Sequence, residues 1–181
     1  MRVITAPGFG PPEVLRIQER PIPHPKADEV VVEVRAAGVD LMDSYLRRGM
    51  HPSAPLPLVL GVEGAGVVIA VGDQLAAKIG DRVAWQGVPG SYAEMVAIRD
   101  ERLIPMPESV TFEAAAGGLM QGLTAQHLCY DAVPVPDGAV VLVHSAASGV
   151  GLDRTYPLND AAEAHRDIES GKTVGKLLLL P

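Results

Sequence analysis

A segment rich in small residues near position 150 carries the clearest chemical signal in the sequence. Residues 139–151 read AVVLVHSAASGVG, an apolar run that ends in a loop of small residues. A buried parallel strand followed by such a loop is typical of dinucleotide sites, where backbone amides approach the phosphates. The loop differs from the G-x-G-x-x-G pattern because Ala146 and Ser148 stand at its first two glycine positions, but both residues are small enough for close approach.

The chain that follows this loop is too short for the usual site. A βαβ unit needs about 30 residues or more, and a dinucleotide fold normally has two such halves. Only 30 residues (152–181) follow Gly151, and they begin LDRTYP, where Asp153 and Pro157 oppose a long helix. Pyrophosphate binding depends on amides aligned at a helix N-terminus. The sequence therefore predicts a remnant loop without useful cofactor affinity.

The elements that would position any site are mostly short strands separated by glycine and proline. In residues 29–38, EVVVEVRAAG, valines alternate with other residues in the period of a half-buried strand. Asp40 can cap a short helix that Gly49 ends. Further strands are predicted at residues 61–72, 80–85, 90–100 and 140–143, and a final buried strand at 176–181. Two more helices are predicted, one from Thr111 to about 133–136 and one from Asn159 or Asp160 to Gly171.

Composition limits the classes of function. The net charge is −7 without a basic run, which argues against nucleic acid and anionic membranes as partners. Cys129 is the single cysteine, so the chain has no internal disulfide and no cysteine-rich zinc site. No apolar stretch reaches 18 residues, and the first 15 residues lack the apolar core of a signal peptide. These features predict a soluble cytoplasmic protein.

The order of motifs resembles the zinc-free quinone oxidoreductase branch of the medium-chain dehydrogenase/reductase superfamily, over nearly the whole chain. The matching motifs are AAGVDLMDSYLRRG (36–49), LGVEGAGVVIAVG (60–72), KIGDRVAW (78–85), GSYAEMV (90–96), GLTAQHL (122–128), VLVHSAASGVG (141–151) and YPLNDAAEAHRDIESGKTVGKLLLLP (156–181). The resemblance implies a mainly β (α+β) fold with peripheral helices: a GroES-like, partly open β-barrel catalytic domain and a remnant of the first Rossmann strand.

The resemblance also divides the chain and suggests an internal deletion. It implies a GroES-like catalytic domain at 1–133, a remnant of the nucleotide-binding domain at 134–152, and a returning helix and strand at 153–181. In the family, the Rossmann domain lies between the loop at 146–151 and the returning helix. We therefore expect an internal deletion, engineered or natural. The alternative is a small natural homologue that never carried the insert.

Zinc is not expected in this chain. In alcohol dehydrogenase relatives the positions that match Asp40 and Val62 are usually Cys and His. Val62 cannot bind a metal, and Asp40 and Glu63 alone cannot build a tetrahedral nitrogen and sulfur site. The five histidines, including His165, show no metal spacing, and surface or capping roles are expected for them.

In zinc-free relatives, hydride passes from NADPH to a quinone or activated alkene, and the protein supplies position and a polarising hydrogen bond. The resemblance places Asp40, Asp43 and Tyr45 near the nicotinamide and the substrate. Many relatives have Asn at the position of Asp40, and a carboxylate lacks the amide donor. Asp40 can alternatively be only a helix N-cap, and Tyr45 a packing residue at the barrel rim.

The cofactor-binding candidates are Thr124 and the loop residues. By resemblance, Thr124 would hydrogen-bond the nicotinamide end of NADPH, although it can equally be an ordinary helical threonine. The phosphate loop would contribute Ala146, Ser148, Gly149, Val150 and Gly151. We expect NADPH to be the cofactor of the parent family and not to bind this chain.

Two functions are compatible with the sequence. The first is the catalytic domain of an NADPH-dependent quinone oxidoreductase with little or no remaining hydride transfer. The second is a non-catalytic oligomeric or binding module of GroES-like fold. Burying Val140–Val143 contributes roughly 6–12 kcal/mol, so these side chains need cover. We expect residues 139–144 to mediate self-association, with folding back onto the chain's own barrel as the competing outcome.

Overall fold

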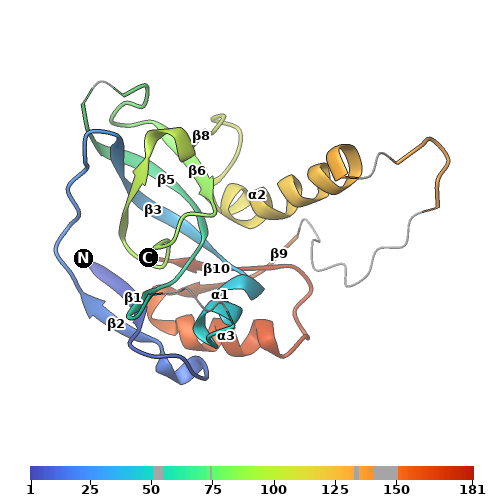
Figure 1. Ribbon diagram of the computed structural model, residues 1–181, viewed down its shortest axis with the longest axis horizontal. Coiled ribbons are helices and arrows are strands. Elements are labelled where there is room, and N and C mark those ends of the chain that lie inside the picture. Colours follow the sequence, from blue (N-terminus) through green and yellow to red (C-terminus); the bar gives the residue numbers. More distant parts are fainter. Residues whose placement is uncertain (51–54, 74, 133–134, 141–150) are drawn as a thin grey trace.

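Two β-sheets form the body of the protein in a computed structural model that describes residues 1–50, 55–73, 75–132, 135–140 and 151–181 (Figure 1). The strands are β1 (Arg2–Ala6), β2 (Arg16–Glu19), β3 (Glu29–Val39), β4 (Leu58–Val59), β5 (Glu63–Val71), β6 (Arg82–Gln86), β7 (Met95–Arg99), β8 (Ile104–Pro105), β9 (Leu152–Pro157) and β10 (Lys176–Leu180). The helices are α1 (Leu41–Arg47), α2 (Phe112–Gln126) and α3 (Ala161–Glu169). Single 3₁₀ turns at Pro12–Val14, Asp100–Arg102 and Leu158–Asp160 and a π-helical turn at His127–Ala132 complete the elements.

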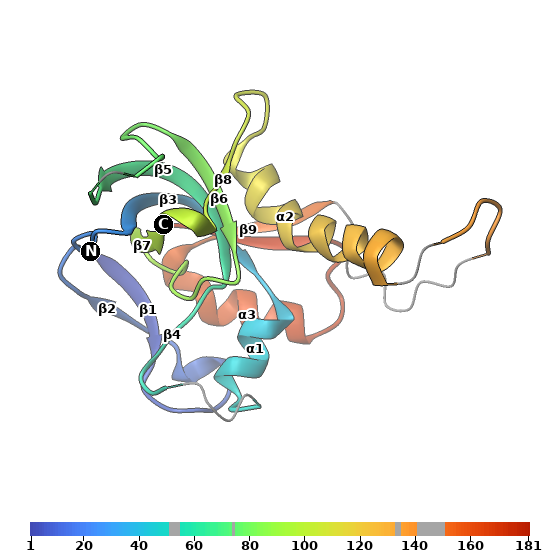
Figure 2. The same cartoon turned by 45° about the horizontal axis from the view of Figure 1, so that its top comes forward.

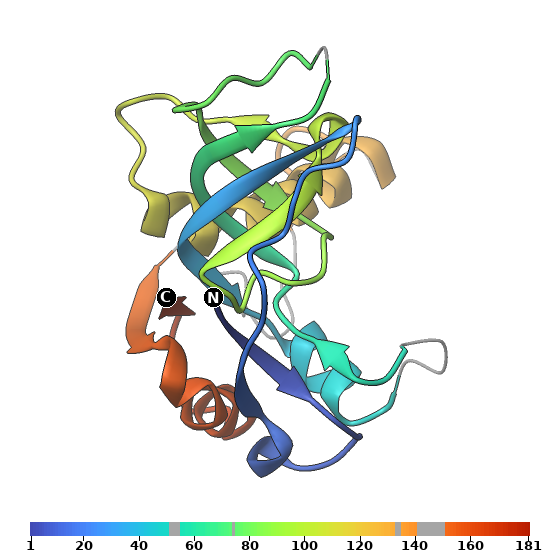
Figure 3. The ribbon, with the colours of Figure 1, turned by 90° about the vertical axis from the view of Figure 1, so that its left-hand side faces the viewer.

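The long strand β3 organises the larger sheet. The sheet has the order β8-β6-β5-β3-β10-β9, and β7 also pairs with β3. Along one edge β3 pairs with β5, whereas the other edge pairs first with β7 and then, from Ala37 to Val39, with β10. The smaller sheet has the order β2-β1-β4. The strongly twisted strands do not close into a barrel in the described part of the chain, and the two termini lie near one another (Figure 3). This arrangement confirms the predicted mainly β body with peripheral helices.

The core explains why the valine-rich segments form strands. Residues such as Val30, Val32 and Trp85 are fully buried between the sheets, together with the strand β10 residues Leu177 and Leu179. Burying each large apolar side chain contributes about 1.5–3 kcal/mol. The predicted strand at 176–181 is therefore a structural part of the body, and the returning C-terminal segment is held by it.

Helix α2 packs on a sheet face made of small residues. Thr111 caps the helix, because its hydroxyl accepts the N–H of Ala114 at 3.1 Å. Ala116 packs on Leu178 and on Ala36, Ala65 and Ala84, and the small side chains of these alanines let the helix approach closely. Beyond Gln121 no such contact continues, and residues 122–132 are all exposed. Figures 1 and 2 show this outer half of α2 pointing away from the sheets.

Most of the predicted elements are present. The helix capped by Asp40, the helix that ends before Gly171, and the strands at 29–38 and 176–181 are confirmed within one or two residues. The helix capped by Thr111 begins as predicted, but its α-helical part ends at Gln126 and a π-helical turn follows to Ala132, before the predicted end at 133–136. The segment after Gly151 is strand β9, which pairs in parallel with β10. The predicted strand at 140–143 lies outside the described residues except for Val140, which is fully exposed. In the described ranges, no helix is both long and apolar enough to cross a membrane.

Candidate functional site

The start of α1 brings two of the predicted site residues together. Asp40 and Asp43 form a capping box, in which the Asp40 N–H donates to Asp43 Oδ2 at 3.1 Å. This bond fixes the first turn of the helix. Both residues are buried, Asp40 to 7% exposure and Asp43 completely. Asp40 is therefore the predicted N-cap, and it also belongs to a buried polar cluster.

That cluster joins four elements around one ammonium group. Lys176 on β10 donates to Asp40 Oδ1 at 2.5 Å and forms an ion pair with Glu63 on β5. Glu63 Oε2 accepts the N–H of Met120 in α2 at 3.2 Å. With its amide oxygen toward Lys176, Gln121 accepts from the ammonium at 2.9 Å. The cluster therefore ties α1, β5 and β10 to the last anchored turn of α2.

Burial strongly affects the charges in this cluster. Burial, followed by the nearby Asp40 carboxylate, raises the pKa of Glu63 to about 8, against the opposing effect of Lys176. Burial alone would lower the pKa of Lys176, but the two carboxylates outweigh this effect and raise it. The surroundings therefore favour the charged form of Lys176 and the protonated form of Glu63.

Gly38 makes room for the cluster. A β-carbon on Gly38 would lie 2.6 Å from the Ala116 carbonyl oxygen and would collide with Glu63 Oε1. We expect Gly38→Ala to lower the free energy of unfolding by about 1–3 kcal/mol, because both neighbours must shift. Gly118→Ala is the matched control. Nothing lies within 4 Å of its added methyl group, and a helical alanine should be neutral or stabilising by up to about 1 kcal/mol. Urea unfolding of both variants checks the prediction, which equal effects would contradict.

A second buried network begins at Asp43. Its carboxylate accepts the Gly61 N–H at 3.0 Å and the Tyr92 hydroxyl at 3.0 Å. The Tyr92 oxygen lies 3.3 Å from His165 Nε2, and Arg47 Nε donates to His165 Nδ1 at 3.1 Å. The network thus connects the start of α1 to α3 through side chains that are all fully buried.

Arg47 fixes the protonation state of His165. Because the Arg47 Nε–H donates to Nδ1, this nitrogen must accept, and the ring proton lies on Nε2. The Nε2–H then donates to Tyr92, which donates to Asp43. Burial, followed by the positive charge of Arg47, lowers the pKa of His165 to about 3. Burial and the Asp40 carboxylate raise the pKa of Asp43 to about 7, although its three donors favour the ionised form.

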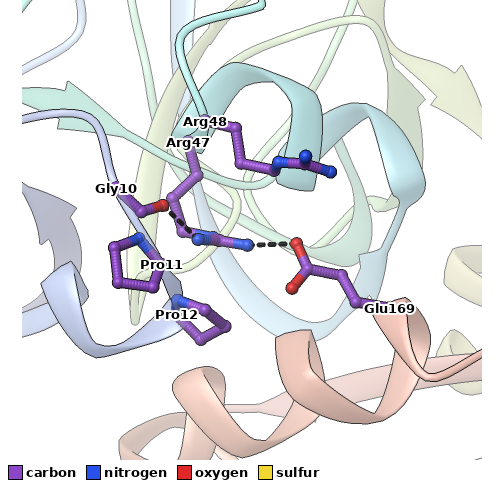
Figure 4. Close-up of a pocket in the computed structure, with 6 residues that line it drawn as sticks. All are labelled: Gly10, Pro11, Pro12, Arg47, Arg48 and Glu169. Atoms are coloured by element: carbon purple, nitrogen blue, oxygen red, sulfur yellow. Dashed lines mark hydrogen bonds and ion pairs between the residues drawn. The ribbon is translucent and has the colours of Figure 1, made fainter.

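The outer end of this network reaches a surface pocket. Figure 4 shows the Arg47 guanidinium between the Gly10 carbonyl and the Glu169 carboxylate, and it bonds to both groups. The pocket has a volume of about 390 Å³, and its other lining residues are Pro11, Pro12 and Arg48. Among the predicted site residues that the structure describes, none lines this pocket, so it lies apart from the site at Asp40.

The other predicted site residues lie at the surface. Tyr45 is 42% exposed on α1, next to the exposed side chains of Leu41 and Met42. We call these three residues the α1 surface. Thr124 lies in the exposed half of α2, and its hydroxyl donates to the Met120 carbonyl at 2.7 Å, as in an ordinary helical threonine. The structure therefore groups Asp40 and Asp43, with Tyr45 on the same helix, whereas Thr124 lies on a different element.

The phosphate loop is described only at its end. Ala146, Ser148, Gly149 and Val150 lie outside the described residues. The carbonyl oxygen of Gly151 accepts the Lys176 N–H at 2.7 Å, and strand β9 begins at the next residue. The backbone after Gly151 is therefore extended, where a phosphate loop would lead into a helix.

The sequence did not identify several residues of the two networks. The expected surface or capping role of His165 is wrong, because its ring is completely buried between Arg47 and Tyr92. Lys176 is the one charged residue in the apolar run KLLLL, and this contrast is a signal that could have marked it. Within the described ranges, no group of three or more His, Cys, Asp and Glu residues could hold a metal ion.

Two family models match the sequence. Residues 26–108 match the alcohol dehydrogenase GroES-like domain, and residues 137–179 match a model described as zinc-binding dehydrogenase. A quinone oxidoreductase of Pseudomonas aeruginosa is 41% identical over 146 residues, which cover 80% of this chain and 45% of the relative. A probable quinone oxidoreductase of Schizosaccharomyces pombe is 41% identical over 145 residues, which cover 79% and 44%. The chain thus spans less than half the length of these relatives.

Solved structures show the same fold. A mycobacterial quinone oxidoreductase superposes with a TM-score of 0.89 at 23% identity, and the match covers 100% of both chains. The Escherichia coli quinone oxidoreductase in complex with NADPH superposes with a TM-score of 0.88 at 21% identity, again over 100% of both chains. These structures show the fold, and the two family models together with the sequence relatives assign the family: the chain belongs to the quinone oxidoreductases of the medium-chain dehydrogenase/reductase superfamily.

Proposed function

We propose that this chain is the zinc-independent catalytic domain of an NADPH-dependent quinone oxidoreductase, that it lacks most of the Rossmann domain, and that it performs little or no hydride transfer. The observation that carries the proposal is the path of the backbone after Gly151, which enters strand β9 and pairs with β10. A dinucleotide needs a helix N-terminus behind the phosphate loop. The described residues offer none at this point, which supports the proposal that this chain does not bind NADPH.

An internal deletion accounts for the two kinds of match. The structural matches extend over the full length of both chains, whereas the sequence matches cover less than half of each relative. In the proposal, residues 1–133 are the GroES-like domain, 134–152 are the remnant, and 153–181 return to the body. A cytoplasmic location belongs to the same proposal.

A substrate wall remains at the start of α1. Leu41, Met42 and Tyr45 expose between 41% and 47% of their surfaces beside the buried Asp40. This apolar surface suits a planar quinone or an activated alkene, the ligand class of the proposed parent enzyme. Residual ligand binding is therefore expected without turnover.

NADPH titration tests the proposal directly. Followed by nicotinamide fluorescence, it should show no saturation, with a Kd above about 1 mM, because the loop amides have no helix to orient them. An intact quinone oxidoreductase is the positive control. Saturable micromolar binding by this chain, or steady reduction of a quinone by NADPH, would contradict the proposal.

A second candidate function is a non-catalytic assembly module. The observation that favours it is the exposed stretch beyond Gln121, where Leu128 is 57%, Tyr130 75% and Val140 100% exposed. Apolar side chains gathered on one projecting segment are typical of an interface with another chain. In this version, residues 139–144 join two copies, although 141–144 lie outside the described residues.

Light scattering after size exclusion distinguishes self-association through residues 139–144 from folding of this segment back onto the body. We expect a dimer or larger assembly that becomes monomeric in the Leu128→Asp, Val140→Asp double variant. Ile79→Asp changes another exposed apolar residue, 66% exposed in the turn between β5 and β6, and should have no effect. A monomer at high concentration would reject self-association and favour folding back onto the body.

A further inference from the structure

The cluster of Asp40, Glu63 and Lys176 has more carboxylate oxygens than hydrogen-bond donors. Asp40 Oδ2 is buried without a hydrogen-bond partner among the described residues. In the described part of the chain, Glu63 Oε1 has its ion-pair contact with Lys176 and no hydrogen-bond partner. Asp40 Oδ1 and Glu63 Oε1 both contact the ammonium group of Lys176, so the two carboxyl groups share one buried site. A proton between the two carboxyl groups would satisfy oxygens that are otherwise unpaired.

The net charge of the cluster also favours a proton between the two carboxyl groups. Two ionised carboxylates and one ammonium would leave a net negative charge in a site where Glu63 is 0%, Lys176 5% and Asp40 7% exposed. An unpaired buried charge is strongly unfavourable, and carboxylates that share a site retain one proton for this reason. Gln121 and the Met120 N–H contribute only neutral dipoles.

We propose that Asp40, Glu63 and Lys176 hold one shared proton, and that the resulting neutral cluster makes the α1 surface selective for uncharged ligands over cations. The inference rests on the proposed function, because it takes Leu41, Met42 and Tyr45 as the remaining substrate wall. Lys176 is a positioning residue in this arrangement. It holds Asp40 from the C-terminal strand and does not itself contact the ligand.

Other ionisable groups near the cluster are few. Asp43 on the same helix is the nearest additional carboxyl group, and Tyr92 faces it from the loop before β7. Burial and Asp40 raise the pKa of Asp43 to about 7, so it also titrates near neutrality. A comparison with a Glu63 variant is therefore needed, because Asp43 titrates in both proteins and its contribution cancels.

Infrared difference spectroscopy tests the shared proton without any ligand or turnover. Between about pH 6.5 and pH 9.5, the wild-type chain should lose the carboxylic-acid C=O band of the cluster in addition to that of Asp43, and gain the matching carboxylate bands, because the cluster releases its proton in this range. Glu63→Gln and Asp40→Asn each leave one carboxylate with Lys176, and this component should be absent from both. A protonated-carboxyl signal that is unchanged in both variants, or absent from wild type, would overturn the proposal.

Two probe ligands test the selectivity. Duroquinone is neutral, and phenyltrimethylammonium is a cation of similar size. Release of the proton creates a negative charge near the α1 surface, so the cation should bind about tenfold tighter at pH 9.5 than at pH 6.5. In Glu63→Gln this increase should fall to the contribution of Asp43. Equal pH dependence in both proteins would reject the selectivity.

Failure of the proposed quinone-binding function can be distinguished from failure of the shared-proton proposal. If duroquinone does not bind at either pH, the retained substrate wall is wrong, whereas the infrared bands still decide whether the proton is present. Circular dichroism at both pH values confirms that each variant is folded. If Glu63→Gln does not fold, Asp40→Asn provides the comparison for the cluster band, because it also leaves the cluster neutral, while the Asp43 band should shift to lower pH because Asp40 no longer raises the pKa of Asp43.

Discussion

Replacing Lys176 with methionine is expected to lower the free energy of unfolding by about 3–5 kcal/mol, because it leaves the carboxyl groups of Asp40 and Glu63 buried without their cation. Methionine preserves most of the volume of the aliphatic stem, so the loss reports charge and hydrogen bonding more than packing. A loss of this size is a large part of the ~5–15 kcal/mol stability of a typical domain. Urea unfolding at neutral pH measures it.

Two further variants show whether this loss comes from the ion cluster. Lys172→Met makes the same change at an exposed position and should alter stability by no more than about 0.5 kcal/mol. Adding Asp40→Asn to Lys176→Met removes the unpaired carboxylate and should recover more than half of the loss. Identical stability of Lys176→Met and wild type, or the absence of any recovery in the double variant, would show that the cluster does not stabilise the fold.

Acid is expected to destabilise the protein through His165. The pKa of this residue falls from its ordinary value of 6.5 to about 3 in the folded chain. Between these two pKa values, His165 therefore binds a proton in the unfolded chain but not in the folded chain. Stability is fully present above about pH 6.5 and is lost as the pH falls toward 3, by roughly 4–5 kcal/mol in total.

His165→Gln isolates this effect. Its amide can accept from Arg47 and donate to Tyr92, but it does not titrate. The variant should show a flatter decline of the unfolding free energy between about pH 6.5 and pH 4 than wild type. Asp43 and Glu63 have raised pKa values and act in the opposite direction, since their stabilisation is lost as the pH rises through about 7 and 8. They titrate in both proteins.

The exposed His24 provides the control for this comparison. His24→Gln should leave the curve of unfolding free energy against pH unchanged, because His24 has no buried contact to lose. Parallel curves for His165→Gln and wild type would contradict the assignment of acid sensitivity to His165.

The body of the fold was predictable because its signals are local. Valine alternation marks β3, Asp40 and Thr111 are caps, and Gly49 and Gly171 end helices at positive φ. Strand β9 was not recognised, because LDRTYP has no apolar alternation and only Tyr156 is buried. It is an edge strand, and the apolar neighbour β10 determines its conformation.

The site was only partly predictable for a related reason. Asp40 and Asp43 follow from a family motif, but their partners Glu63, Tyr92, His165 and Lys176 come from distant parts of the chain. Nothing in the neighbourhood of His165 in the sequence distinguishes a surface histidine from a buried one. Its environment arises only when α1 and α3 pack together and bring Arg47 to its ring.

The anchoring of Gln121 and Gly151 has a consequence for how the fold tolerates insertions. Both positions are attached to Lys176, one through its ammonium and the other through its backbone N–H. The body is therefore complete on either side of the intervening polypeptide. Because the entropy of closing a flexible loop grows by only about 0.6 kcal/mol for each doubling of its length, these two points can accept a short connector or an entire module. The scaffold is thus a natural acceptor for grafted domains.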